Sequence, residues 1–233
     1  MYNLNIYPFF KKIEFLKNKL RIFHAPYINN FDTRIVSLSN MQVDIIGFQS
    51  SLNLFYENTL DNKYADLPKR IHSPLNLQET YDLYQKYQVN NFYTSFHFRI
   101  SSLFTNIFNF LSEETNNLKN FKQIYDKVMK FVFYENFSHL QQPILVLTYI
   151  RNSLHNNGMH LNNLALNYQI DQTNFEFKPN SPVMCSSLNH LLLLIPKVIE
   201  SIDATLSVKI DKWNRYIVEP YAKYLKLNDA NYF

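Results

Sequence analysis

Glycine is almost missing from this chain of 233 residues, which contains only Gly47 and Gly158. Tight turns, phosphate-binding loops and folds with many β-hairpins depend on glycine, because it adopts positive φ angles without a steric penalty. The shortage therefore argues against a Gly-rich phosphate loop and against an all-β fold. It favours a fold made mainly of helices.

Cysteine and long apolar segments are also scarce. Cys185 is the only cysteine, so no intrachain disulfide can form, and a single thiol fits a reducing compartment. The first residues lack the apolar run and small-residue cleavage site of a secretory signal. The apolar run at residues 191–195 is far too short to cross a bilayer. We therefore expect a soluble, cytoplasmic protein with no membrane partner.

The composition that remains is typical of a folded domain. Hydrophobic residues make up 46% of the chain and charged residues 18%, a balance that predicts a packed core. A formal net charge of +4 permits an acidic partner without requiring one. The densest basic segment, residues 11–21, is interpreted as the solvated face of a first helix. Net charge therefore does not identify the class of ligand.

Apolar residues recur at helical spacing through most of the chain. The predicted helices cover residues 4–23, 32–57, 76–111, 118–134, 183–206 and 208–226, and a further helix begins after Ser138 as its cap and ends at residues 156–158. Asn76 and Glu79 have the spacing of a capping box at the start of the third of these helices. A strand pattern appears at residues 164–170 and 175–177, with Asp171, Gln172 and Thr173 as the turn. We predict one domain, residues 1–233, with an all-α helical-bundle fold and a short β-hairpin inserted near residues 164–178.

The segment that combines charge, a titratable ring and apolar support is residues 147–160. Arg151 and His155 are four residues apart, which places both side chains on one helix face with their Cβ atoms about 5–6 Å apart. Gly158 can take the left-handed conformation that ends a helix. His155 then lies in the last turn, where the helix dipole favours the protonated ring and the Arg151 charge opposes it. We expect His155 to titrate near neutral pH.

A guanidinium beside an imidazole suits cleavage of an RNA phosphodiester by the neighbouring 2′-hydroxyl. His155 would accept the hydroxyl proton, and Arg151 would bind the phosphate through two hydrogen bonds. Asn152 would bind the phosphate or orient the imidazole. Asn156 and His160 are further candidates for RNA contact, although Asn156 also fits as a helix cap. The chemistry requires neither a metal ion nor a cofactor.

These residues resemble a known family. Arg151-Asn152-Ser153-Leu154-His155, near the end of a late helix in an all-helical chain, is similar to the motif of the HEPN superfamily. In that family four to six residues separate the arginine from the histidine, whereas three separate them here. The resemblance implies a metal-independent endoribonuclease of a toxin–antitoxin, phage-defence or RNA-processing system. It also implies a homodimer whose two motifs share one cleft, and an antitoxin or defence-complex protein as a partner.

Other interpretations of the same residues stay open at this stage. Arg151 can pair with a carboxylate such as Glu113 or Asp126, and His155 can cap helix carbonyls. The chain would then be a helical protein-interaction module, or an inactive HEPN-like protein that binds nucleic acid or a nucleotide. A metal site at His155 and His160 is disfavoured, because no third ligand lies near them in sequence. Structural roles are assigned to the remaining titratable candidates, Cys185, His24, His72, His97, His139 and His190.

Overall fold

The computed structural model describes residues 5–24, 28–60, 67–70, 74–112, 120–133, 136–208, 210–217 and 220. The helices are α1 (Tyr7–Phe23), α2 (Thr33–Leu60), α3 (Leu67–Arg70), α4 (Leu77–Leu111), α5 (Phe121–Val132), α6 (Ser138–His155), α7 (Leu188–Leu206) and the 3₁₀ turn η1 (Asp211–Trp213). The strands are β1 (Met159–His160), β2 (Leu166–Ile170), β3 (Thr173–Phe177) and β4 (Ser181–Pro182). This architecture confirms the predicted all-α helical fold with a hairpin inserted near residues 164–178.

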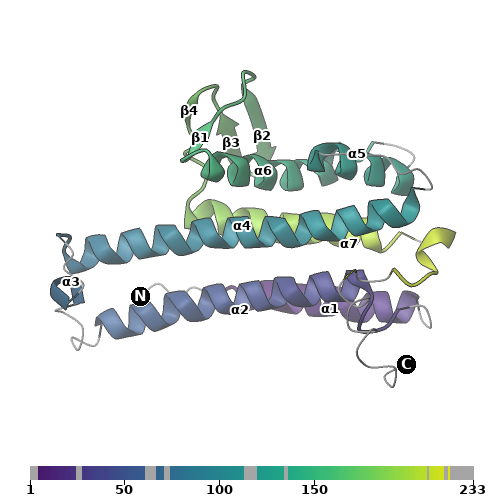
Figure 1. Cartoon of the computed structure of the whole chain (residues 1–233), viewed down its shortest axis with the longest axis horizontal. Helices are drawn as coiled ribbons and strands as arrows, with labels where there is room; N and C mark the ends of the chain where they lie inside the picture. Colours follow the sequence, from purple (N-terminus) through teal and green to yellow (C-terminus); the bar gives the residue numbers. More distant parts are fainter. Residues whose placement is uncertain are drawn as a thin grey trace.

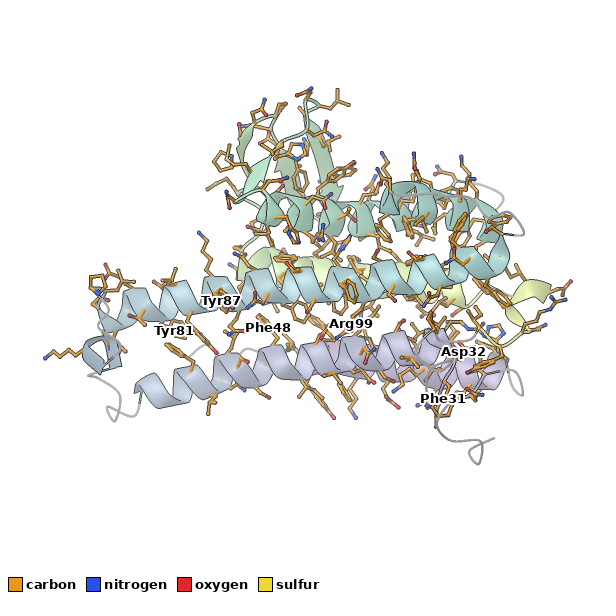
Figure 2. The ribbon with its side chains drawn as sticks, viewed as in Figure 1. Phe31, Asp32, Phe48, Tyr81, Tyr87 and Arg99 are labelled. Carbon is orange, nitrogen blue, oxygen red and sulfur yellow. The ribbon has the colours of Figure 1, made fainter. Side chains whose placement is uncertain are left out.

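The helices are arranged in layers around α4, the longest of them (Figure 1). Helices α1 and α2 lie on one side of α4, while α5, α6 and the strands lie on the other, and α7 runs alongside. Helix α2 is antiparallel to α4. Their contacts run from Thr33 with Asn106 through Phe48 with Phe92, whose rings are 4.8 Å apart. Figure 2 shows Phe48 and Arg99 in the space between these two helices.

Capping explains why α4 begins where the sequence predicts. Asn76 Oδ1 accepts a hydrogen bond from the Glu79 N–H at 2.9 Å, and Glu79 Oε2 accepts from the Asn76 N–H at 2.9 Å. Both halves of the predicted capping box are therefore present. Most of the buried residues of α4 are apolar and lie on more than one face of the helix, because a helix in the middle layer packs against neighbours on several sides.

The strands form two separate antiparallel pairs. Strands β2 and β3 pair from Leu166 with Phe177 to Ile170 with Thr173, so the turn holds only Asp171 and Gln172. Thr173, predicted in the turn, belongs to the strand. The second pair, β1 with β4, has two residues in each strand and was not predicted. Strands this short carry too little alternation to be recognised in a sequence.

Helix boundaries differ from the predicted ones at several ends. Helix α7 begins only at Leu188, because Ser187 caps it: the Ser187 Oγ accepts from the His190 N–H. Helix α6 begins at Ser138 itself and its N-cap residue is Phe137, while the Ser138 N–H donates to Asn136 Oδ1 at 3.0 Å. Part of the segment between the helices predicted at residues 32–57 and 76–111 is helical, as the end of α2 and as α3.

The predicted helix at residues 208–226 is wrong over residues 208 and 210–217. The chain forms the single turn η1 there and is irregular from residue 214 to Ile217. The backbone carbonyls of Trp213 and Arg215 accept hydrogen bonds from Arg34, at 3.1 and 2.9 Å, instead of from a following helical turn. Most of the remainder of that prediction lies outside the described residues.

A fully buried ion pair joins the start of α2 to this C-terminal segment. The Arg34 Nε and Nη2 atoms donate to the two oxygens of Asp32 at 2.8 and 2.9 Å, and both side chains have no exposed surface. Asp32 Oδ2 also accepts from the Ile217 N–H at 3.0 Å. A buried ion pair is tolerated when further hydrogen bonds satisfy its polar atoms, which is the case here.

Replacing Asp32 by Asn is expected to destabilise the protein by about 3–5 kcal/mol, because Arg34 would keep a buried charge without a counter-ion. Urea unfolding measures the change, and fluorescence of Trp213, the only tryptophan and fully buried, reports on this segment directly. Glu176→Gln is the matched control. It removes the exposed ion pair with Lys178 (3.3 Å) and should cost less than about 1 kcal/mol. Equal effects of the two substitutions would contradict the structural importance of the buried pair.

Candidate functional site

The last turns of α6 present the predicted motif on one helix face. The helix is anchored in the core just before the motif by Leu147 and Ile150, which are fully buried. The helix ends near the predicted residues, and the Gly158 N–H donates to the Ser153 carbonyl at 2.8 Å. Asn157 (φ 54°) takes the left-handed conformation that commonly ends a helix, and Gly158 (φ 82°) follows it. The chain then turns into β1.

Arg151 carries a positive charge that no acid from the described part of the chain neutralises. Its Nη1 donates to Asn152 Oδ1 at 3.1 Å, and its side chain is half-buried. No carboxylate among the described residues lies within ion-pair distance of it. Asp126, considered as a partner, accepts instead from the Gln141 amide at 2.7 Å. Glu113, the other candidate, lies outside the described residues.

The structure brings four of the five predicted site residues together. Asn152, His155 and Asn156 are exposed in the same turns as Arg151. Within the described portion, the His155 ring has no hydrogen-bond partner, so it remains available to a ligand. The Asn156 backbone N–H caps the helix by donating to the Ser153 carbonyl at 2.9 Å.

His160 does not join the other four. Its side chain is only 4% exposed, and its Nε2–H donates to the Leu164 carbonyl at 3.3 Å. Its ring packs against Tyr149 and Phe177, with centroid distances of 6.0 and 5.5 Å. His160 thus holds the β1 region against α6 and the hairpin, and we assign it no contact with RNA.

His97, to which we assigned a structural role from the sequence, lies beside the motif. This α4 residue is 6% exposed, and its Nε2–H donates to Thr148 Oγ1 at 3.2 Å. The Thr148 hydroxyl in turn donates to the Ile144 carbonyl at 2.8 Å, which leaves its oxygen to accept from the ring. Burial, and then the charges of Arg151 and His155, lower the pKa of His97 from 6.5 to about 4. His97 is therefore a neutral imidazole at pH 7.

The Ser187–His190 contact is a helix cap and not a second candidate site. Ser187 Oγ and His190 Nδ1 are 2.7 Å apart, a distance that also suits an activated nucleophile. Ser187 is, however, the N-cap of α7, and its partner is the third residue of that helix. The Ser187 hydroxyl oxygen accepts from the His190 N–H, and the contact with the His190 ring accompanies this cap.

Grooves described elsewhere on the surface do not coincide with the motif. Three of them, with volumes of about 550, 390 and 270 Å³, have neither Arg151 nor His155 in their walls. Among the described residues, no group of three or more His, Cys, Asp or Glu side chains is placed to hold a metal ion.

Comparison of the chain with protein-family models, with curated proteins and with solved structures yields no match. Across the described helices, none is long and apolar enough to cross a membrane. Function therefore has to be argued from the chemistry of the site.

The pKa of His97 predicts a loss of stability in mild acid. Unfolded His97 binds a proton near pH 6.5 and folded His97 near pH 4, so between these values the unfolded chain binds more protons. As pH falls from 6.5 to 4, His97 should cost the protein about 3 kcal/mol of stability, at 1.36 kcal/mol per pKa unit. Urea unfolding at several pH values measures this slope.

His97→Gln supplies the control, because an amide can donate to Thr148 without titrating. Burial also lowers the pKa of His24 and of His190, so only the difference between wild type and this variant isolates His97. In NMR titrations, Arg151→Ala should raise the pKa of His97, since it removes a nearby like charge. An unchanged His97 titration in Arg151→Ala would show that the two groups are not close.

Proposed function

We propose that Arg151 and His155 form the site of a metal-independent endoribonuclease of the HEPN type. One observation carries the proposal: a cation without a carboxylate partner in the described residues and a solvent-exposed imidazole share one face at the end of α6. RNA offers both a phosphate for the cation and a 2′-hydroxyl proton for the ring. A helix end anchored in the core by Leu147 and Ile150 holds the two groups in fixed relation.

The reaction would be an attack of the 2′-hydroxyl on the adjacent phosphorus. His155, in its neutral form, accepts the hydroxyl proton as the O–P bond forms. Arg151 binds the non-bridging oxygens and stabilises the charge that builds on them. The 5′-oxygen leaves and takes a proton from solvent, which yields a 2′,3′-cyclic phosphate and a 5′-hydroxyl. Atoms and charge balance without a metal ion or cofactor.

Asn152 contributes by fixing the direction of the guanidinium. Its Oδ1 accepts from Arg151 Nη1, so the remaining N–H groups of Arg151 and the Asn152 amide N–H₂ are left for the phosphate. Asn156 is exposed one residue beyond His155 and is placed to contact the ribose or base next to the cleaved bond. His97 stays neutral beneath them, so it adds no third positive charge.

A second candidate function is binding of RNA or a nucleotide without cleavage. The spacing favours it: three residues separate Arg151 from His155, whereas the HEPN motif has four to six. An arginine and a histidine directly one turn apart can both contact one phosphate, which leaves no general base for the 2′-hydroxyl. Binding and cleavage are therefore measured separately.

Purified protein should cleave single-stranded RNA in EDTA and leave 2′,3′-cyclic phosphate ends. His155→Ala should lower the rate by about 10²- to 10⁴-fold, as expected for loss of a general base. Arg151→Ala should lower it by about 10²- to 10³-fold, as expected for loss of charge stabilisation. Arg151→Lys should restore it only partly, because lysine lacks the two-pronged geometry.

His139→Ala is the control, since His139 is an exposed histidine in the first turn of the same helix. It should leave the rate unchanged. Trp213 fluorescence verifies that every variant is folded. If the wild-type protein binds RNA without cleaving it, the second candidate function is supported. If cleavage persists in both alanine variants, the motif performs neither function.

A further inference from the structure

The outward face of α2 is apolar or uncharged although it meets solvent. The α2 stripe consists of Val43, Ile46, Gly47, Ser50, Asn53 and Leu54, all exposed. Val43 and Leu54 are each 64% exposed and Ile46 is 50% exposed. None of the six residues is charged. Exposed apolar residues that follow one helix face mark an interaction surface more often than isolated ones do.

Gly47 adds an independent observation at the centre of the stripe. Glycine inside a helix costs about 1 kcal/mol relative to alanine. A Cβ atom at Gly47 would meet no described residue within 4 Å, and its φ is not positive, so neither packing nor backbone conformation in the described part of the chain requires glycine. A glycine at such a position allows another molecule to approach the helix backbone closely.

The stripe is complementary to itself when two copies run antiparallel. In such a pair, residues whose numbers sum to 93 lie at the same level. Ile46 then faces Gly47 of the second copy, and Val43 faces Ser50, so each large side chain meets a small one. An interface of this kind is isologous, because a two-fold axis exchanges the two halves.

The same register continues outward along the helix. Leu54 faces Ser39, again a large residue against a small one, and Asn53 faces Asn40, so two amides can exchange hydrogen bonds. Because the facing residues carry no charge, the pairing buries no unpaired charge. A groove of about 390 Å³, lined in part by Ile46, Ser50 and Asn53, lies beside the stripe and leaves room for the Asn40 and Val43 side chains of the second copy.

We propose that two copies of this chain associate through the α2 stripe, antiparallel, about a two-fold axis between Ile46 and Gly47. The stripe lies in the α1–α2 layer, which α4 separates from α6 (Figure 1). The two Arg151/His155 sites therefore face away from each other and share no cleft. This dimer differs from the arrangement that the HEPN resemblance implies, and it is independent of whether the site cleaves RNA.

Sedimentation equilibrium of the full chain tests the association. Wild type should be a dimer, and Ile46→Glu should weaken the dimer by more than about 100-fold by burying two like charges near the axis. Leu83→Glu is the matched control, since Leu83 is 58% exposed on α4 and should not affect association. Gly47→Ala should raise the melting temperature of the monomer and yet weaken the dimer. A wild-type chain that stays monomeric up to about 100 µM overturns the proposal.

Cysteine cross-linking tests the register. In a Cys185→Ser background, Ile46→Cys should cross-link with a short bismaleimide, because the two copies of residue 46 lie within about 2 Å along the helix axis. Leu54→Cys should not, because its two copies lie about 22 Å apart along that axis. Equal cross-linking at both positions indicates parallel pairing and overturns the antiparallel proposal. A dimer that Ile46→Glu leaves intact places the interface elsewhere and overturns it as well.

Discussion

The buried Asp32–Arg34 ion pair is the constraint on which the layering of this fold depends. A charged pair without solvent contact is stable only when its remaining donors and acceptors are occupied, and here they bind the backbone of residues 213–217. The C-terminal segment is thereby tied to the first turn of α2. Thr33, between the two charged residues, extends the network, because the Asn106 amide donates to its hydroxyl at 2.8 Å. The position of α2 on α4 is therefore fixed at one end by polar contacts.

From that end, contacts between α2 and α4 continue along the two helices. Arg99 Nε donates to Asp44 at 3.3 Å, and farther along the rings of Phe48 and Phe92 pack together. The opposite face of α4 carries His97, whose hydrogen bond to Thr148 locates α6. Helix α4 thus contacts both α2, which begins at the buried ion pair, and α6, which carries the candidate site. Because α4 occupies the space between the layers, the α6 end and the α2 stripe lie on opposite sides of the molecule and do not compete for surface.

The parts of this structure that could be predicted are those in which local signals and tertiary contacts agree. The cap at Asn76, the apolar face of α6 and its end at Gly158 each follow from neighbouring residues. The C-terminal segment could not be predicted, because its carbonyls are satisfied by Arg34, about 180 residues away in sequence. Apolar spacing alone made that segment look helical.

In the candidate site, too, some residues could be predicted from local sequence and others could not. Arg151, Asn152, His155 and Asn156 are neighbours in sequence, so helix geometry alone brings them together. His97 comes from another helix, and no spacing rule connects it with residue 151. His160 was selected for its nearness in sequence, but the turn after Gly158 directs its ring into the contacts with Tyr149 and Phe177. Sequence proximity therefore predicts which side chains lie together within one helix. It does not predict the direction of a side chain that follows the turn at the helix end.

The charge of Arg151 at the end of α6 is the feature on which our proposal of an anionic ligand depends. The C-terminal end of a helix carries partial negative charge, which stabilises nearby cations by about 0.3–1 kcal/mol. This contribution lowers the cost of the Arg151 charge at the helix end, and it is too small to neutralise that charge. Burial, and then the charges of Arg151 and His155, hold the neighbouring His97 neutral. No carboxylate among the described residues pairs with Arg151, so the described surroundings supply no counter-charge. In the proposed function, the phosphate of an RNA ligand supplies the counter-charge that Arg151 lacks among the described residues.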